Sequence, residues 1–269
     1  MSLFNVQGIT AVVTGGGSGI GRAIAAVLLA RGAGTVVVAD INLDNATDVC
    51  TGLAAAGWAG LAVPIHIDVA DGASIEAVVR QVEVECGPID LWCSNAGIHT
   101  GAGLGDARDW ERSIAVNLMG HVHAARFVIP GMKQRGRGHF LVTASAAGLL
   151  SDFRAAPYTA SKHAAVALAE WLAITCMGDG ISVHCLCPEG VKTAMTRESS
   201  EKSGKGMTFL EPEDVAAFTL DCMSDGDFLI LPHPRVAEFE LRRATDRQRW
   251  IESMHRASLS MQPQLATPS

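Results

Sequence analysis

The stretch Thr14-Gly15-Gly16-Gly17-Ser18-Gly19-Ile20-Gly21 follows a short apolar run, residues 9–14, and decides the fold. Glycines let the chain turn tightly and let backbone N–H groups approach a pyrophosphate. From Gly19 to Arg31 apolar residues recur at helical spacing, and the positive end of that helix would face the same ligand. A strand, a glycine-rich turn and a helix in this order indicate a dinucleotide site. Taken alone, the turn also fits a tight loop that binds nothing.

Working outward from this turn, strand-like and helix-like stretches alternate along the chain. The further strands we expect are Thr35–Ala39, Gly60–His66, Ile89–Ser94, Gly138–Thr143 and Ile181–Cys187, and the helices are Leu43–Ala56, Ser74–Cys86, Ala107–Gln134 and Tyr158–Met177. Such alternation means right-handed crossovers and a parallel sheet. We therefore predict a single α/β domain, a doubly wound parallel sheet with helices on both faces.

Two segments interrupt this alternation. Residues 189–210 form a polar stretch too long for an ordinary connection, which indicates a lid or binding loop within the domain 1–233. Residues 234–261 read as one charged helix, so we assign 234–269 as a C-terminal helix and tail of the same domain.

The composition excludes several classes of protein. The 269 residues are 48% hydrophobic and 18% charged, which is typical of a packed globular chain. A net charge of −7 offers no footprint for nucleic acid. No apolar run approaches the roughly 20 residues that span a bilayer, and the first residues lack a signal peptide's pattern. The seven cysteines include no Cys-x-x-Cys pair, so we expect buried free thiols and a cytoplasmic protein.

Asp40 ends the second expected strand, 19 residues after Gly21. An acidic residue about 20 residues beyond the turn holds the adenosine ribose hydroxyls of NAD, and it repels the extra phosphate of NADP. Neither Ser18 nor Ile41 supplies a compensating cation. We therefore expect NAD as the cofactor; an N-cap role for Asp40 in the next helix is the alternative, and the two roles are compatible.

Tyr158, the only tyrosine, lies four residues before Lys162, so both share one helix face. Bringing a phenol of pKa near 10 to neutral pH requires about 4 kcal/mol. A lysine cation about 4 Å away, at an effective dielectric of about 20, supplies about 4 kcal/mol. Ser145 follows an expected strand, where its hydroxyl can hold a substrate oxygen. Asn117 is a poor residue for a helix interior, so it is either functional or satisfied locally.

Together these residues resemble the short-chain dehydrogenase/reductase family over nearly the whole chain, to about Pro234. The matching motifs are Thr14-Gly15-x-x-x-Gly19-x-Gly21, Asp68-Val69, Ser94-Asn95-Ala96-Gly97, Asn117, Ser145, Tyr158-x-x-x-Lys162 and 188–193. In this order and spacing they are highly specific, and they imply a Rossmann-type fold and an oxidoreductase of secondary alcohols and ketones.

The resemblance also implies roles for individual residues. Asn117, Ser145, Tyr158 and Lys162 would be catalytic, with Lys162 also gripping the nicotinamide ribose and Asn117 anchoring a water in a proton relay. Asp68 and Val69 would contact the adenine, and Thr193 the nicotinamide carboxamide. The cofactor site would comprise Gly15, Ser18, Gly19, Ile20, Gly21, Asp40, Asp68, Val69, Asn95, Ala96, Gly97, Tyr158, Lys162, Pro188, Val191 and Thr193.

The chain departs from the family pattern in two places. Glu189 stands where the family usually has a glycine, after Pro188. This carboxylate would either alter the nicotinamide pocket or, as we favour, point away from it. The family's glycine-rich ending is also missing, because the run 229–234 leads into a helix, which leaves the subunit packing open.

We expect a substrate pocket built from apolar and flexible side chains, which suits a mainly apolar alcohol or ketone. Its residues would be Ser145, Leu149, Leu150, Phe153, Tyr158, Met195, Met207 and Phe209. His99 either touches the substrate or, as we favour, is a solvated loop residue. No metal site is expected, since His121 and His123 lie on different helix faces and Cys185 and Cys187 lack further ligands.

The helix 158–177 is apolar nearly all round, so a homodimer or homotetramer through this helix and the long one before it is expected. A catalytically silent NAD-binding sensor or scaffold is the competing interpretation, but such a protein has no use for Ser145, Tyr158 and Lys162. An epimerase or dehydratase that uses NAD internally is a further alternative; the short chain, without an added substrate domain, argues against it.

Overall fold

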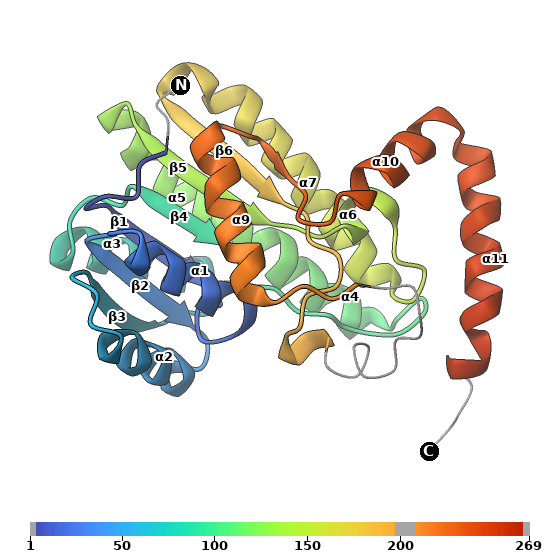
Figure 1. Cartoon of the computed structure of the whole chain (residues 1–269), viewed down its shortest axis with the longest axis horizontal. Helices are drawn as coiled ribbons and strands as arrows, with labels where there is room; N and C mark the ends of the chain where they lie inside the picture. The colour runs from blue at the N-terminus through green and yellow to red at the C-terminus, as the bar shows by residue number, and fades with distance from the viewer. Residues whose placement is uncertain (1–3, 197–207, 266–269) are drawn as a thin grey trace.

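Seven parallel strands form one sheet in the order β3-β2-β1-β4-β5-β6-β7 (Figure 1). The computed structural model describes residues 4–196 and 208–265. The strands are β1 (Thr10–Thr14), β2 (Thr35–Asp40), β3 (Leu61–His66), β4 (Leu91–Ser94), β5 (Gly138–Thr143), β6 (Ile181–Leu186) and β7 (Leu229–Ile230). The predicted doubly wound α/β fold is therefore confirmed.

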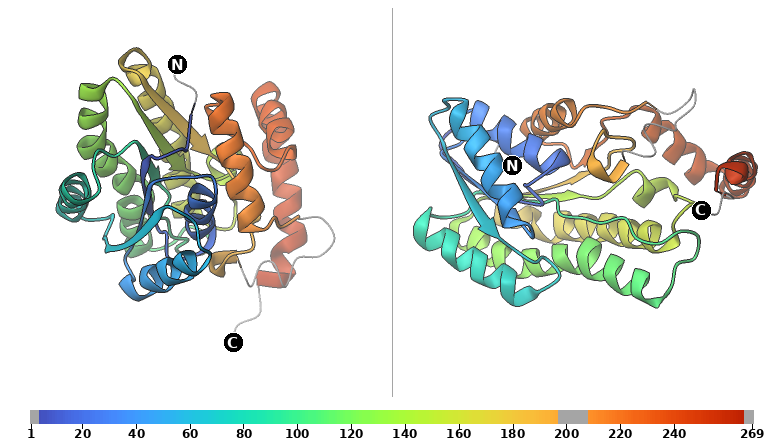
Figure 2. Two further views of the ribbon diagram at one scale, coloured as in Figure 1. Left: turned by 60° about the vertical axis from the view of Figure 1, so that its left-hand side comes forward. Right: turned by 90° about the horizontal axis from the view of Figure 1, so that it is seen from below.

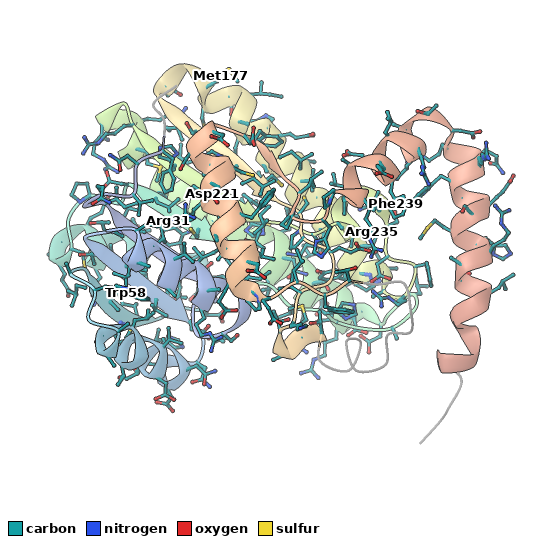
Figure 3. All side chains as sticks on the ribbon, viewed as in Figure 1. Arg31, Trp58, Met177, Asp221, Arg235 and Phe239 are labelled. Atoms are coloured by element: carbon teal, nitrogen blue, oxygen red, sulfur yellow. The ribbon has the colours of Figure 1, made fainter. Side chains whose placement is uncertain are left out.

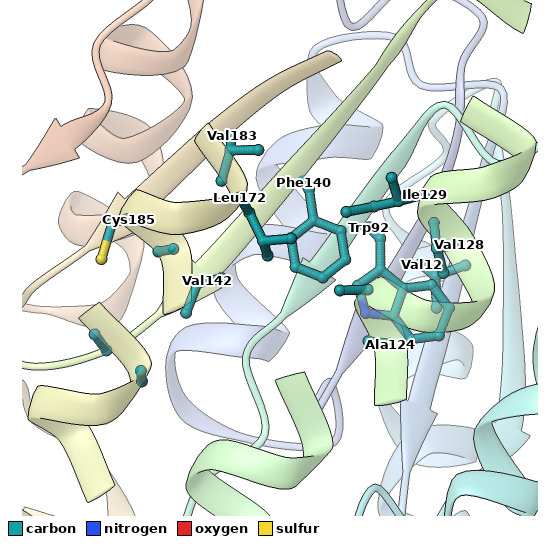
Figure 4. Close-up of a cluster of buried hydrophobic side chains, with 14 of the residues drawn as sticks. Val12, Trp92, Ala124, Val128, Ile129, Phe140, Val142, Leu172, Val183 and Cys185 are labelled. Carbon is teal, nitrogen blue, oxygen red and sulfur yellow. The ribbon is translucent and has the colours of Figure 1, made fainter. Parts of the chain in front are cut away.

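Helices cover both faces of the sheet (Figure 2). One face packs against α3 (Gly72–Glu85), α5 (Gly120–Arg135) and α7 (Ala156–Cys176). The other face packs against α1 (Gly19–Ala30), α2 (Leu43–Ala55) and α9 (Pro212–Asp225). On the first face the buried side chains of Trp92 and Phe140 lie near each other in one hydrophobic cluster (Figure 4). Alternate residues of β4 and β5 enter opposite cores, as expected of strands covered on both sides.

The long helix predicted over Ala107–Gln134 is interrupted. The structure has α4 (Ala107–Ile114), a π-helical turn over Ala115–Met119 and then α5. The π turn is centred on Asn117, whose side chain bonds the backbone of Ile98 on a neighbouring loop. Such turns often occur at functional sites, because they displace one residue from the regular helix.

The prediction of a single C-terminal helix over 234–261 is wrong, because this helix is also interrupted. The chain forms α10 (Arg235–Thr245) and α11 (Arg247–Leu265), with a break at Asp246. The Asp246 carboxylate accepts a hydrogen bond from the backbone N–H of Arg249 at 2.9 Å, so it caps a new helix. We call α10 and α11 the C-terminal arm; α11 lies at the outer edge of the molecule (Figure 1).

α10 is the part of this arm that is anchored to the domain. The side chain of Val236 is fully buried in the core, and Phe239 packs against the core's edge (Figure 3). A short helix, α6 (Ala147–Leu150), lies beside α10 and follows Ser145 directly. The arm therefore reaches the edge of the sheet where the strands end.

Candidate active site

The glycine-rich turn after β1 is fixed by hydrogen bonds to Asn95. Its side-chain amide donates to the carbonyl oxygen of Thr14 at 3.0 Å, while the Thr14 hydroxyl accepts the backbone N–H of Asn95 at 3.0 Å. A Cβ added to Gly21 would lie 2.2 Å from the Gly15 carbonyl oxygen, and one on Gly15 would lie 2.9 Å from the Ala96 backbone. The glycines are therefore required for the close packing of this turn against β4 and α1.

The N-terminus of α1 is open toward a cavity. Ser18 is its N-cap residue and is exposed, and no acidic side chain lies in the first turn. The cavity has a volume of about 390 Å³ and is lined by Gly17, Ser18, Gly19, Arg22, Lys192, Thr193, Ala194 and Pro212. Its two cations are paired with carboxylates, Arg22 with Glu213 and Lys192 with Glu211. The N–H groups at the helix N-terminus therefore offer the main site for a phosphate group. The cradle thus fits the pyrophosphate expected from the sequence.

Asp40 lies at the carboxyl end of β2, beside this turn. One carboxylate oxygen accepts the backbone N–H of Gly17 at 2.9 Å, and the other accepts that of Asn42 at 2.9 Å. Asn42, not Asp40, caps α2, because its side chain accepts the N–H of Asn45. The alternative N-cap role for Asp40 is therefore wrong, and the carboxylate is fixed beside the glycine turn.

Asp68 and Val69 follow β3 at the same edge of the sheet. The Asp68 side chain accepts the N–H of Ala70 at 2.9 Å, and Val69 is buried against Gly120 at the start of α5. Asn95, Ala96 and Gly97 follow β4 there. The structure thus brings the residues expected around a dinucleotide to one edge.

Ser145, Tyr158 and Lys162 converge beyond β5. Ser145 is buried and accepts the N–H of Ala147 at 3.1 Å, and its hydroxyl lies near enough to Tyr158 to lower the pKa of that phenol. Tyr158 and Lys162 lie on one face of α7, and the Lys162 ammonium is 5.9 Å from the centre of the tyrosine ring. A Cβ on Gly97 would lie 3.3 Å from Lys162 Nζ. The three side chains therefore stand next to the loop that follows β4.

The electrostatics of the pair differ from our expectation. Burial raises the pKa of Tyr158, and the nearby Ser145 hydroxyl and Arg154 oppose this rise without cancelling it. Lys162 donates to the Thr143 carbonyl oxygen at 2.9 Å, and burial lowers its pKa to about 8. The Lys162 ammonium is thus bonded to the backbone, 5.9 Å from the centre of the tyrosine ring. Because its pKa is raised, the phenol of Tyr158 is protonated at neutral pH.

Asn117 is fully buried and its amide is engaged on both sides. Its oxygen accepts the N–H of Ile98 at 2.8 Å, and its nitrogen donates to the Ile98 carbonyl at 2.9 Å and to Ser161 Oγ at 3.1 Å. The side chain is therefore fully hydrogen-bonded within the protein, although its partners are 19 and 44 residues away in the sequence. A water-anchoring role would fall to its backbone carbonyl in the π turn.

Polar groups surround Tyr158 on the solvent side. The ring of His99 packs against that of Tyr158 with centroids 4.7 Å apart, although His99 is largely exposed. Burial is the main influence that lowers the pKa of His99, and Asp152 opposes it. Asp152 and Arg154 form a bidentate pair at 2.8 and 2.7 Å. His99 is thus both exposed and in contact with the candidate acid.

The expected substrate residues divide by exposure. Leu149 and Leu150 are buried in α6, Phe153 is 36% exposed, and Met195 is 52% exposed on the loop after β6. Phe209 packs near Gly190, and Met207 lies outside the described residues.

Sequence reasoning missed three residues near this site. His121 is buried with Nδ1 2.7 Å from Ser94 Oγ, and burial followed by the Lys162 charge lowers its pKa to about 3. His233, two residues before α10, and Arg235, the first residue of α10, contact the loop after β6. The unusual residue Glu189 was the one sequence signal for the last two.

Neither a cluster of metal ligands nor a membrane-spanning helix is found in residues 4–196 and 208–265, the part of the chain that the structure describes. Among them, no three His, Cys, Asp or Glu side chains gather as metal ligands would. No helix of that part is long and apolar enough to span a bilayer.

Comparisons with known proteins agree with this geometry. Residues 9–204 match the family described as short chain dehydrogenase. The chain is 35% identical to meso-2,3-butanediol dehydrogenase of Serratia marcescens, over 80% of this chain and 86% of the relative. It is 34% identical to D-beta-hydroxybutyrate dehydrogenase of Cupriavidus necator, over 73% and 76%. A short chain dehydrogenase/reductase from Burkholderia phymatum, solved in complex with NAD, superposes with a TM-score of 0.81 at 30% identity, covering 91% of this chain and 96% of that one.

Proposed function

Because the chain belongs to the short-chain dehydrogenase/reductase family and is thus an oxidoreductase of alcohols and ketones, we propose that it transfers hydride between NAD(H) and a small secondary alcohol or ketone. The observation that carries this proposal is the convergence of Ser145, Tyr158 and Lys162 beyond β5, with the buried Lys162 ammonium 5.9 Å from the centre of the Tyr158 ring.

The residues of the chain divide the work as follows. Ser145 holds the substrate oxygen, and Tyr158 exchanges a proton with that oxygen as general acid or base. In reduction, the raised pKa of Tyr158 keeps the phenol protonated until it donates. In oxidation, the Lys162 cation and the nearby Arg154 favour the phenolate that accepts the proton. The nicotinamide, when bound, supplies or accepts the hydride.

We assign NAD rather than NADP on the position of Asp40. Its carboxylate is fixed by Gly17 and Asn42, beside the cradle of the glycine turn, where a further phosphate would meet like charge. The residues proposed to hold the cofactor are those named from the sequence, from Gly15 to Thr193. Thr193 faces the turn, since a Cβ on Gly19 would lie 3.1 Å from it.

For the substrate we propose a small, mainly apolar molecule with one reacting oxygen. Leu149, Phe153 and Met195 would bound it on the apolar side, and Ser145 and Tyr158 would hold the oxygen. His99 then stands at the rim, where a second polar group of the substrate would meet its ring. A substrate panel in which only charged sugars reacted would refute this assignment.

We also propose a homo-oligomer that uses the outer face of α7. Trp171 and Ile174 on this helix, and Met177 directly after its last residue, are all more than half exposed. Three large apolar side chains exposed together at one helix end are typical of a protein–protein interface.

The experiment compares wild type with Tyr158→Phe, following reduced nicotinamide by absorbance with NAD, NADP and a panel of secondary alcohols. An oxidoreductase of the proposed kind loses turnover by at least about a hundredfold in Tyr158→Phe and keeps its affinity for NAD. Equal NAD binding without turnover in either protein would favour the competing interpretation, a silent NAD-binding sensor.

A further inference from the structure

Glu189, which replaces the family's usual glycine, forms a bidentate ion pair with Arg235 of the C-terminal arm. Arg235 Nε lies 2.6 Å from one carboxylate oxygen and Nη2 lies 2.7 Å from the other. The side chains are 19% and 32% exposed, respectively, so the pair is largely shielded from water. Two parallel charge-assisted bonds fix direction as well as distance. The two segments they join are 46 residues apart.

His233 holds the same loop through its backbone. Its Nδ1 accepts the N–H of Glu189 at 3.2 Å, and its Nε2 lies 3.0 Å from the carbonyl oxygen of Gly190. Because Nδ1 is the acceptor, Nε2 carries the proton and donates to Gly190. His233 is only 4% exposed. One buried ring therefore holds backbone groups of two successive residues, Glu189 and Gly190.

The loop that is gripped in this way carries the residues proposed to meet the cofactor. The Pro188 carbonyl accepts the N–H of Ala146, next to Ser145, at 2.8 Å. Lys192 donates to the Leu210 carbonyl at 2.9 Å. Beyond these contacts, Thr193 stands across the cavity from Gly19. The position of Thr193 thus depends on the backbone contacts of the residues that precede it in the sequence, Pro188 to Lys192.

The arm supplies a firm base for these contacts. Val236, next to Arg235, is fully buried, and Phe239 one turn further packs against the core (Figure 3). A rigid support behind a binding loop reduces the conformational entropy that the loop loses when the ligand binds.

We propose that Glu189, His233 and Arg235 form a clamp that holds the loop 190–194 in the conformation that receives the cofactor. These are positioning residues, and they make the C-terminal arm part of the cofactor site. The inference rests on the proposed nicotinamide function and adds to it residues that lie outside the family's usual motifs.

The test measures NADH affinity, by the change in its fluorescence, and hydrogen exchange of the 190–194 amides without cofactor. The variants are Glu189→Gln, Arg235→Met and the double variant, with Arg235→Lys as the conservative change. Glu238→Gln with Arg242→Met is the matched control, since it removes an exposed ion pair from the same helix.

We expect each single variant to weaken NADH binding about tenfold and to speed exchange in the loop. The double variant should lose less affinity than the sum of the two single losses, because both changes remove the Glu189–Arg235 ion pair. Arg235→Lys should recover part of the affinity, and the control pair should bind as wild type does.

Affinity within twofold of wild type in Glu189→Gln and Arg235→Met, with unchanged exchange, would overturn the clamp. So would additive losses in the double variant. If wild type itself bound no NADH, the proposed function would fail instead, and the exchange data would still decide whether the clamp orders the loop.

Discussion

The ammonium group of Lys162 lies 2.9 Å from the carbonyl oxygen of Thr143 and 5.9 Å from the centre of the Tyr158 ring. It is buried, and no carboxylate within the described residues forms an ion pair with it. Burial of this cation lowers the free energy of unfolding, as is common for charged side chains that are preorganised in a binding site.

This cost should appear in the dependence of stability on pH. The pKa of Lys162 is lowered to about 8 in the folded protein, against about 10.4 in an unfolded chain. Between these values the unfolded state binds more protons, so the lysine makes the free energy of unfolding rise with pH. The rise is at most about 3 kcal/mol. Urea unfolding from pH 7.5 to 10.5 should show this component in wild type and not in Lys162→Met.

Other groups titrate in the same range, so the informative quantity is the difference between the two proteins. Lys133→Met is the matched control, since Lys133 is a surface residue paired with Asp179 and its pKa is raised. Parallel curves for wild type and Lys162→Met would contradict the prediction.

His121 should act at the opposite end of the pH scale. Burial and the Lys162 charge lower its pKa to about 3, well below the usual value near 6.5. The stability that depends on neutral His121 is complete above about pH 6.5 and is lost as the pH falls toward 3, by up to about 1.4 kcal/mol per pH unit. His121→Gln should flatten this acid limb, as measured by urea unfolding. His123→Gln, a change two residues away on a different face of the same helix, should leave the slope of the acid limb as it is in wild type.

Asp40 should decide between the two nicotinamide cofactors. Asp40→Asn removes the negative charge and keeps one of the two side-chain oxygens, so that one of the N–H groups of Gly17 and Asn42 retains its acceptor. We expect the ratio of kcat/KM for NAD over NADP to fall at least about tenfold, which corresponds to about 1.4 kcal/mol. Asp44→Asn, a neutralisation in the first turn of α2, is the control. An unchanged ratio in Asp40→Asn would place the selectivity elsewhere.

The sequence predicted the sheet closely and the long-range contacts poorly. Buried parallel strands are uninterrupted apolar runs, so Gly138–Thr143 was recovered to the residue. The glycine turn was recognisable because its chemistry is local. The hydrogen bonds of Asn117, by contrast, go to Ile98, 19 residues away, and no periodicity reports such a partner.

The same reason explains the C-terminal errors. α9 was not predicted, although Pro212 at its start and Gly226 after its end are ordinary boundary signals. The break at Asp246 was also overlooked, because an Asp inside a charged stretch reads as one more surface residue until its cap contact is seen. Glu189 was noticed as unusual, yet its partner Arg235 follows only from the folded structure.

The Asn117 contacts predict a large loss of stability on substitution. Asn117→Ala leaves both backbone groups of Ile98 without their partner, and a buried unsatisfied group costs about 1–3 kcal/mol. We expect a loss of about 2–4 kcal/mol in the free energy of unfolding, measured in urea. Asn117→Asp with a protonated carboxyl keeps the acceptor and has one O–H donor in place of two amide N–H donors, so its effect on unfolding should be intermediate. Asn45→Ala, on the exposed face of α2, should cost little.

The outer face of α7 gives the last prediction, which concerns assembly. Trp171 and Ile174 are 60% and 76% exposed, and they lie three residues apart on one side of the helix. If this face is an interface, Ile174→Glu buries a charge between subunits, and such a charge without a partner is strongly unfavourable. Sedimentation velocity at micromolar concentration should then show the variant as a monomer and the wild type as a dimer or tetramer. Val84→Glu is the control, because Val84 is 85% exposed on α3, away from α7. A monomeric wild type, or an assembly that survives Ile174→Glu, would mean that subunits associate elsewhere or not at all, and the C-terminal arm would be the next surface to test.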